Sequence, residues 1–261
     1  TPSYMFTLRD RCRDELGISP RDLGLKRGYF GGEGLLQQQG VRDEIEAEFG
    51  ITAFDANYGM SEVTSIIAGE GPERNGLEYH ARGILYAELV DEHGKEVPIE
   101  EGAVGELVFS TLRREGQPLF RYRTNDIAKI LHSEIGEDGL LRMRMHVIGR
   151  SDEMLIIRGV NFFPQSIQSI IGRFEPNIGR FYRVVMPTGS TEGINVILET
   201  SVPEGEQRAK LTDEVIKATS AMLQVKPTIT WVPMESIPRD GNKNRLLVQA
   251  DDELVQQTMS R

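Results

Sequence analysis

Two short stretches of the sequence carry side chains that suit a bound nucleotide. The first reads Tyr58-Gly59-Met60-Ser61-Glu62 and comes directly after a segment with the pattern of a strand. An aromatic ring can stack on a base, a serine hydroxyl can donate a hydrogen bond to a phosphate oxygen, and a glutamate carboxylate can hold Mg²⁺. The glycine leaves the backbone free to turn. By spacing alone, an ordinary loop after a strand is the simpler interpretation.

The second stretch reads R-Y-R-T-N-D and ends at Asp126. A carboxylate held at the end of a strand can accept two hydrogen bonds from the diol of a ribose. The letters T-N-D also favour a tight turn, so a structural role for Asp126 is the alternative. Nearer the start of the chain, a glycine-rich segment, Gly31 to Gly34, follows a predicted strand. Glycines there let the backbone approach a ligand closely, although a plain strand–turn–helix has the same pattern.

A third stretch, residues 147–171, concentrates many specific positions. It predicts a strand that stops at Gly149, a charged turn, and a second strand that stops at Arg158-Gly159. A helix follows, because Pro164 suits a first helical turn. The residues at i, i+3 and i+4 on the apolar face of that helix are Ile167, Ile170 and Ile171. By spacing alone, an ordinary hairpin leading into a helix is an equal alternative.

Apolar periodicity predicts the elements that position these stretches. A helix is expected from Tyr4 to Leu16. The order strand, helix, strand over residues 26–57 predicts the end of an open, mostly parallel sheet, where ligands bind beyond the carboxyl ends of the strands. Residues 70–75 are expected to form a mobile loop. Residues 76–149 have the pattern of short strands in a compact antiparallel unit, and the rest of the chain predicts a small α+β domain with its helices on one face of a sheet.

Composition bounds the class of protein and its partners. The 261 residues are 39% hydrophobic and 27% charged, which suits one large or two modest soluble domains. A net charge of −10 disfavours nucleic acid and anionic membrane surfaces as partners. The single cysteine excludes an internal disulfide and a multi-cysteine metal site. No apolar run is long enough to span a bilayer and no signal peptide opens the chain, so a cytoplasmic location is expected.

Residues 149–164, G-R-S-D-E-M-L-I-I-R-G-V-N-F-F-P, resemble the hinge and following loop of the adenylate-forming ligases, and in detail those of the phenylacetate–coenzyme A ligase family. The resemblance extends from Thr1 to about Arg245. It implies an α/β and α+β fold, the C-terminal part of the adenylate-forming ligase fold. The implied domains are the tail of a large α/β adenylation subdomain (residues 1–75), an antiparallel β subdomain (76–149) and a small mobile α+β domain after the hinge (150–261).

The resemblance also implies roles for individual side chains. Residues 58–62 match the family's Y-G-x-[ST]-E motif, whose aromatic ring packs on adenine, whose hydroxyl meets the α-phosphate and whose glutamate binds Mg²⁺. Residues 122–126 match Y-R-T-[GR]-D, whose aspartate binds the ribose hydroxyls, with Asn125 in place of the family's glycine or arginine. The implied nucleotide-binding residues are Gly32, Glu33, Tyr58, Gly59, Ser61, Asp126 and Arg150, with Glu62 as the metal ligand.

A catalytic lysine is implied near the C-terminus. The family carries this lysine in a polar glycine loop, and Lys243 is the candidate here, acting with Ser61 and Glu62. Asn242 separates Lys243 from the glycine, and Arg245 follows it by two positions rather than the family's three. A solvated loop lysine is the alternative interpretation.

The implied reaction is an AMP-forming acid–thiol ligation in two steps. A carboxylic acid, expected to be aromatic, attacks the α-phosphate of MgATP to give an acyl-adenylate, and the thiol of coenzyme A then displaces AMP. Between the steps, the family rotates its small domain about a hinge, here Asp152, which brings a loop with Arg158 and Gly159 to the path of the thiol. The implied cofactors are ATP or AMP, Mg²⁺ and coenzyme A, and family members are often homodimers.

Two other functions stay open. The same adenylate chemistry serves other acceptors, such as a carrier-protein thiol or a deazaflavin hydroxyl. The sequence has no match to the family's glycine-, serine- and threonine-rich loop for the β- and γ-phosphates, which predicts an incomplete ligase that turns over poorly alone. A non-catalytic nucleotide-binding module is the alternative from a different class. It accounts for the missing loop but not for the retention of Ser61, Glu62, Asp126 and Arg150.

Overall fold

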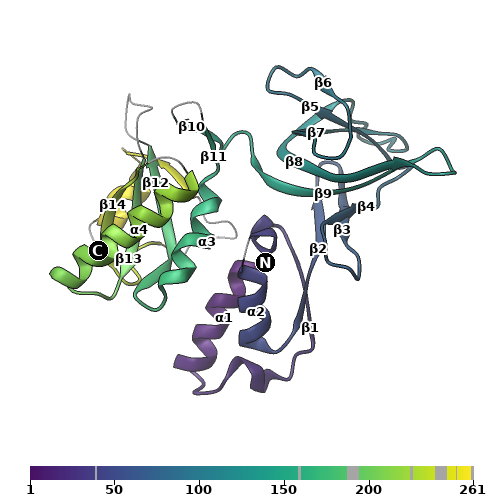
Figure 1. Ribbon diagram of the computed structural model, residues 1–261. Helices are drawn as coiled ribbons and strands as arrows, with labels where there is room; N and C mark the ends of the chain where they lie inside the picture. The colour runs from purple at the N-terminus through teal and green to yellow at the C-terminus, as the bar shows by residue number, and fades with distance from the viewer. Residues whose placement is uncertain are drawn as a thin grey trace. The chain divides into compact units, whose positions relative to one another are not determined.

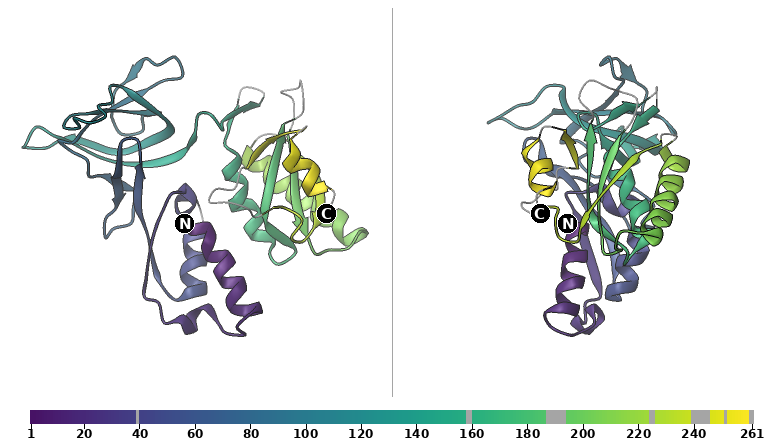
Figure 2. Two further views of the ribbon diagram at one scale, coloured as in Figure 1. Left: turned by 180° about the vertical axis from the view of Figure 1, so that it is seen from behind. Right: turned by 90° about the vertical axis from the view of Figure 1, so that its left-hand side faces the viewer.

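The computed structural model describes residues 1–38, 40–157, 160–186, 194–223, 226–238, 246–250 and 252–259. The chain divides into two compact units, Thr1–Asp152 and Glu153–Arg261, here called unit 1 and unit 2 (Figures 1 and 2). Each unit has its own sheet and its own hydrophobic core. The three-part division after residues 75 and 149 that the family resemblance implies stays a prediction.

Unit 1 is built on a nine-stranded sheet with the spatial order β1-β2-β3-β4-β9-β8-β7-β5-β6. The pair β1–β2 is parallel and the other neighbouring pairs are antiparallel. The strands are β1 (Arg27–Gly31), β2 (Thr52–Met60), β3 (Thr64–Glu70), β4 (Leu77–Tyr79), β5 (Leu85–Val90), β6 (Glu96–Val97), β7 (Val104–Thr111), β8 (Tyr122–Ile135) and β9 (Leu141–Arg150). The helical elements are α1 (Pro2–Asp14), η1 (Pro20–Leu23), η2 (Gly34–Gln37) and α2 (Val41–Phe49).

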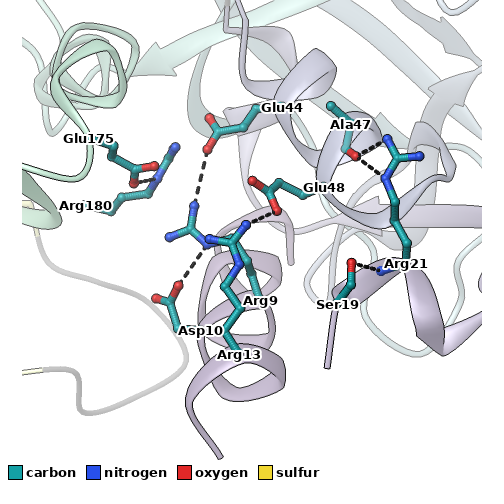
Figure 3. Close-up of polar contacts among 10 residues, drawn as sticks. All are labelled: Arg9, Asp10, Arg13, Ser19, Arg21, Glu44, Ala47, Glu48, Glu175 and Arg180. Carbon is teal, nitrogen blue, oxygen red and sulfur yellow. Dashed lines mark hydrogen bonds and ion pairs between the residues drawn. The ribbon is translucent and has the colours of Figure 1, made fainter. Parts of the chain in front are cut away.

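The helices α1 and α2 pack beside the parallel strand pair. Pro2 opens α1, where its fixed φ suits the first helical turn, and α1 ends at Asp14 rather than at the predicted Leu16. The buried face of α2 carries three apolar residues spaced four apart, and they join a core with residues of β1 and β2. Two ion pairs connect the helices (Figure 3): Arg9 with Glu44, at 3.5 Å, and Arg13 with Glu48, at 2.5 Å.

The antiparallel strands of unit 1 differ from the predicted pattern in two respects. The residue pattern predicts separate strands over residues 119–123 and 127–132, whereas the structure has one long strand, β8. β3 pairs with both β2 and β4, so the parallel pair and the antiparallel strands form one continuous sheet. The sequence of β3, T-S-I-I-A-G-E, lacks a clear alternation of apolar and polar residues, which is why the pattern does not reveal it.

A buried polar network joins α2, β2 and β3. Arg42 donates hydrogen bonds of 2.6 and 2.8 Å to the two carboxylate oxygens of Glu70. Glu70 ends β3 and its side chain is 2% exposed, so the prediction that it belongs to a mobile loop is wrong. Glu70 also accepts a 2.8 Å hydrogen bond from the backbone N–H of Asp55, and the Asp55 carboxylate accepts one of 2.7 Å from Gln37.

Asp55 is only 3% exposed, and its environment changes its acidity. Burial raises the pKa of Asp55 to about 6, the hydrogen bond from Gln37 lowers it in part, and the neighbouring charge of Glu70 adds to the increase. The guanidinium of Arg42 acts in the opposite direction. Asp55 is therefore a buried acid that changes its charge near neutral pH.

Unit 2 contains a four-stranded sheet with the order β14-β13-β12-β15 and a separate hairpin of β10 and β11. β12 is antiparallel to β13 and parallel to β15, and β13 is parallel to β14. The strands are β10 (Leu155–Ile157), β11 (Val160–Phe162), β12 (Ile178–Met186), β13 (Asn195–Thr200), β14 (Thr228–Pro233) and β15 (Leu247–Gln249). The helical elements are η3 (Pro164–Ile167), α3 (Gln168–Ile171), η4 (Gly172–Phe174), α4 (Glu206–Leu223) and α5 (Glu253–Met259).

Alternate residues of the central strands of unit 2 face different helices. Val184 and Val196 belong to the core that α4 covers, whereas Val185 and Ile197 cluster with Val255 of α5. The helices α4 and α5 therefore lie on opposite faces of the sheet, as the views from the front and from behind show (Figures 1 and 2). The prediction that helices cover one face only is wrong, because α5 is a short helix of seven residues with little apolar periodicity.

Two buried charged residues fix the chain that follows β14. Arg183 of β12 donates a 3.0 Å hydrogen bond to the carbonyl oxygen of Pro238. Glu199 of β13 accepts one of 2.8 Å from the backbone N–H of Ile237. Burial lowers the pKa of Arg183, and the charge of Glu199 opposes that decrease. Pro238, the last described residue before position 246, is thus anchored to the sheet of unit 2.

None of the helices in the described part of the chain is both long and apolar enough to cross a membrane.

Replacing Asp55 by Asn tests the polar network through the pH dependence of stability. The folded protein holds the pKa of Asp55 at about 6, above its ordinary value of 3.8. The folded state therefore keeps a proton that the unfolded chain releases, so this stabilisation is complete below pH 4 and is lost as the pH rises through about 6. We expect the parent to lose on the order of 3 kcal/mol of unfolding free energy relative to Asp55→Asn between pH 4 and pH 7.5.

Urea unfolding followed by circular dichroism at several pH values measures this difference. The single tryptophan, Trp231, lies in β14, so its fluorescence reports the unfolding of unit 2 separately. Asp43→Asn, at an exposed position of α2, is the control and is expected to leave the shape of the pH curve unchanged. Parallel curves for the parent and Asp55→Asn would contradict the role given to Asp55.

Candidate functional site

Three of the predicted nucleotide-binding residues come together in unit 1. The hydroxyl of Tyr58, in β2, donates a 2.7 Å hydrogen bond to Oδ2 of Asp126, in β8. The guanidinium of Arg150, at the end of β9, donates one of 3.2 Å from Nη1 to Oδ1 of the same carboxylate. Asp126 and Arg150 are direct partners in the register of β8 and β9, so the sheet itself sets their separation. These three side chains are here called the carboxylate cluster.

Asp126 lies within β8, so the predicted position at a strand end is wrong. Its backbone N–H donates to the hydroxyl of Thr124 at 3.0 Å, and that hydroxyl donates to the carbonyl oxygen of Leu107 at 2.8 Å. Asn125, between them, has φ 62°, in the left-handed region that asparagine tolerates better than most residues. This local irregularity inside a strand takes the place of the predicted turn, and the left-handed backbone suits the asparagine at position 125.

A buried glutamate supports this irregularity from the neighbouring strand. Glu106 of β7 is 2% exposed and accepts a 3.0 Å hydrogen bond from the backbone N–H of Asn125. Its other carboxylate oxygen binds the guanidinium of Arg123. The register of β7 with β8 shifts between Glu106 and Val108. Sequence reasoning missed Glu106, although a lone glutamate inside the apolar run V-G-E-L-V-F is a detectable signal.

Arg150 connects the carboxylate cluster to the predicted hinge residue. Its Nε and Nη2 atoms donate to the two oxygens of Asp152 at 2.9 and 2.8 Å, while Nη1 reaches Asp126. Asp152 is exposed, and it is the last residue of unit 1. One guanidinium therefore bridges two carboxylates, one buried and one at the point where the chain leaves unit 1, and its single positive charge is shared between them.

Tyr58 acts as a hydrogen-bond donor at neutral pH. Burial raises its pKa well above the ordinary value, and the negative charge of Asp126 raises it further. The adjacent Gly59 is required by the sheet, because a Cβ atom there would lie 2.0 Å from the carbonyl oxygen of Ser65 in β3. Residues 58–60 are thus part of β2 rather than a loop after it, and the turn follows at residues 61–63.

Ser61 and Glu62 occupy the turn between β2 and β3, and both are exposed. Arg114 donates hydrogen bonds to the carbonyl oxygens of Glu62 and Val63, which holds the turn through its backbone. Among the described residues, no hydrogen bond joins the side chains of Ser61 or Glu62 to the carboxylate cluster, and no group of three or more His, Cys, Asp or Glu residues is placed to bind a metal. Because both side chains are exposed, they can meet groups brought by a ligand.

The glycine-rich segment lies against the strand that carries Tyr58. Gly31 is opposite Asn57 in β2, and a Cβ atom on Gly31 would lie 2.6 Å from the carbonyl oxygen of Asn57. Gly32 has φ 83°, which favours glycine. The carboxylate of Glu33 accepts hydrogen bonds from the backbone N–H and the hydroxyl of Ser3, at 3.2 and 2.6 Å. The lack of a side chain at Gly31 therefore lets the glycine-rich segment pack closely against β2.

Arg158, Gly159 and Lys243 lie outside the described residues, so their predicted roles stay predictions.

Substitutions of Asn125 test the left-handed residue inside β8. Asn125→Val is expected to destabilise unit 1 by about 1–2 kcal/mol, because a β-branched residue is strained at positive φ. Asn125→Gly relieves that strain and is expected to stay within about 1 kcal/mol of the parent. Urea unfolding followed by circular dichroism, with Trp231 again reporting unit 2, measures both. Equal destabilisation by the two variants would show that backbone conformation is not what selects this residue.

Comparison with known proteins gives the relatives of the chain. Residues 159–250 match the family described as AMP-binding enzyme C-terminal domain. The chain is 34% identical over 248 residues to the phenylacetate-coenzyme A ligase of Escherichia coli (strain K12), an alignment that covers 93% of this chain and 55% of that protein. It is 36% identical over 222 residues to the phenylacetate-coenzyme A ligase of Aromatoleum evansii, with coverages of 82% and 48%. The chain spans about half the length of these curated relatives.

A solved structure agrees with this relationship. The crystal structure of 2-hydroxyisobutyryl-CoA ligase in the postadenylation state, in complex with 2-HIB-AMP, resembles the chain with a TM-score of 0.81 and 26% sequence identity, covering 100% of this chain and 56% of that one. The predicted fold class, the α/β and α+β C-terminal part of an adenylate-forming ligase, is confirmed. By sequence and by fold, the chain is a relative of the phenylacetate–coenzyme A ligases among the adenylate-forming enzymes.

Proposed function

We propose that this chain supplies the nucleotide-binding residues and the C-terminal domain of an AMP-forming acid–thiol ligase. The observation that carries the proposal is the carboxylate cluster, in which Tyr58 and Arg150 fix a largely buried aspartate, in a chain related to phenylacetate–coenzyme A ligases. A carboxylate fixed in this way is suited to two vicinal hydroxyls of a ribose, because each of its oxygens can accept more than one hydrogen bond. The proposed ligand of the cluster is the adenosine monophosphate part of ATP or of an acyl-adenylate.

The remaining nucleotide contacts follow from the elements beside the cluster. The half-buried ring of Tyr58 is the proposed surface for adenine, with Gly32 and Glu33 at its border. The adjacent turn offers the Ser61 hydroxyl to the α-phosphate and the Glu62 carboxylate to Mg²⁺. One protein carboxylate is enough for Mg²⁺ when phosphates and water complete its coordination, so the exposed Glu62 fits the ion.

The first chemical step brings an anionic acid to an anionic phosphate. Glu62 would hold Mg²⁺, which when bound would lower the negative charge on the phosphates. The proposed ammonium of Lys243 adds a positive charge as the α-phosphate is attacked. Anchoring of Pro238 by Arg183 gives the segment before Lys243 a fixed starting point on unit 2. The Ser61 hydroxyl is the proposed donor to the α-phosphate from unit 1.

Transfer to the thiol is proposed to use the hinge after unit 1. The chain divides after Asp152, which supports this residue as the hinge, and Arg158 and Gly159 follow it at the proposed path of the thiol. Coenzyme A is the proposed acceptor because the relatives are named phenylacetate-coenzyme A ligases. The aromatic nature of the acid, a homodimeric state, a cytoplasmic location and the absence of nucleic-acid and membrane partners stay predictions from the sequence.

Calorimetry with AMP tests the nucleotide site. The purified chain is expected to bind AMP, and Asp126→Ala is expected to weaken binding about tenfold or more, because it removes two hydrogen bonds to a charged group. Asp43→Ala, at an exposed position of α2, is the control and should bind as the parent does. Equal binding by the parent and Asp126→Ala would remove Asp126 from the site. An absence of heat for both would favour a different function for the chain.

Lys243→Ala separates adenylation from binding. We expect ATP–pyrophosphate exchange with aryl acids to fall by about 10²–10³, while AMP binding changes less than about threefold, because the ammonium acts on charge that develops during attack. The assay needs this chain joined to a region corresponding to the first half of its relatives. Lys226→Ala, also in unit 2, is the matched control. A loss of AMP binding equal to the loss of exchange would contradict the proposed role.

A further inference from the structure

Gln37, at the end of η2, makes two hydrogen bonds of opposite polarity. Its Nε2 donates to Oδ2 of Asp55, in β2, at 2.7 Å, and its Oε1 accepts from the backbone N–H of Val147, in β9, at 2.9 Å. In the sheet order, β3 and β4 lie between β2 and β9, so the amide joins two strands that are not hydrogen-bonded to each other. Gly34, at the other end of η2, also lies on β9, because a Cβ atom there would be 3.4 Å from the carbonyl oxygen of Val147.

The two strands that Gln37 joins carry opposite sides of the carboxylate cluster. Asp55 is three residues before Tyr58, and Val147 is three residues before Arg150. Gln37 itself follows Glu33 and the glycine-rich segment by one turn of η2. Gln37 therefore connects the part of β2 before Tyr58, the part of β9 before Arg150 and the glycine-rich segment.

We propose that Gln37 is a positioning residue of the nucleotide site, whose amide sets the distance between β2 and β9 and seats the glycine-rich segment on both. Gln37 touches no proposed ligand group and acts through Tyr58, Arg150 and Gly32. The inference rests on the proposed nucleotide site, and it adds a residue outside the motifs that the sequence resemblance marks.

The surroundings of Asp55 explain why this position needs an amide. The charged groups that act on Asp55 are Arg42, from α2, and Glu70, from β3. Arg42 donates to both oxygens of Glu70, and its charge lowers the pKa of Asp55 only in part. On the side of β9, His146 is half-buried and burial lowers its pKa, so it supplies no fixed positive charge. A neutral side chain with one donor and one acceptor is what both partners require.

The carboxylate of Glu46, in α2, binds other groups. It accepts a 2.7 Å hydrogen bond from the backbone N–H of Ala53 and also binds the guanidinium of Arg74. Glu46 therefore has its own donors, and it leaves the Asp55 carboxylate to Gln37.

Gln37→Glu tests the proposal through pH. At the lower pH, two carboxyl groups at hydrogen-bond distance can share one proton. At the higher pH both ionise and repel each other. We expect the AMP affinity of this variant, divided by that of the parent at each pH, to fall at least tenfold between pH 6 and pH 9. The protonated variant reproduces both hydrogen bonds, so the ratio should approach one at pH 6.

The double variant Gln37→Glu with Asp55→Asn reverses the polarity of the pair and restores its charge. The amide introduced by Asp55→Asn then donates to the carboxylate at position 37, which also accepts from Val147, and the pair again contains a single ionisable carboxyl group as in the parent. We expect AMP affinity within about threefold of the parent at every pH from 6 to 9. Gln37→Met, which has similar size but neither hydrogen bond, should bind weakly at every pH. Gln249→Glu, at an exposed position of β15, is the control for an added charge.

Each outcome separates this inference from the proposed function. A parent chain that binds no AMP contradicts the proposed nucleotide site. In that case hydrogen exchange still tests the contact between Gln37 and Val147: the Val147 amide should lose its protection in Gln37→Met and regain it in the double variant. A parent that binds AMP, with Gln37→Met and Gln37→Glu binding equally well, overturns the positioning role. The positioning role is also overturned if the double variant has the circular dichroism of the parent but still binds AMP weakly.

Discussion

The carboxylate of Asp126 is held from two sides, by side chains that the strands around it bring together. Tyr58 and Arg150 each bind one of its oxygens, so β2, β8 and β9 meet at a single buried charge. Removing that charge from water has a cost, which the guanidinium and the hydroxyl offset. Because a carboxylate oxygen can accept more than one hydrogen bond, a contact that stabilises the sheet can also prepare a binding site.

A second buried acid, Asp55 in β2, has different partners. Asp55 receives a neutral amide rather than a guanidinium, while Arg42 is committed to Glu70. The two acids differ accordingly in their partners: the guanidinium that binds Asp126 also binds Asp152 at the end of unit 1, and the amide that binds Asp55 links β2 to β9. Unit 1 thus separates the charge that would meet a ligand from the charge that fixes its framework.

The sequence predicted the family, the fold class and most of the regular elements, because helices such as α4 and strands such as β5 carry strong periodicity and short polar boundaries. It also led to Tyr58, Asp126 and Arg150, whose side chains prove to be in contact. It did not predict that Asp126 lies inside β8, because T-N-D normally favours a turn and here the left-handed Asn125 is held by Glu106 from another strand. It also missed Gln37, since a glutamine in Q-Q-Q carries no signal until distant strands supply its two partners.

The anchoring of Pro238 has a counterpart on the other side of the stretch that contains Lys243. Arg183 holds the carbonyl oxygen of Pro238, and the backbone N–H of the next residue along β12, Val184, holds the carbonyl oxygen of Leu246 at 2.7 Å. Pro238 and Leu246, the described residues on either side of this stretch, are therefore hydrogen-bonded to adjacent residues of β12. The sheet of unit 2 therefore fixes the two described positions, Pro238 and Leu246, between which Lys243 lies in the sequence.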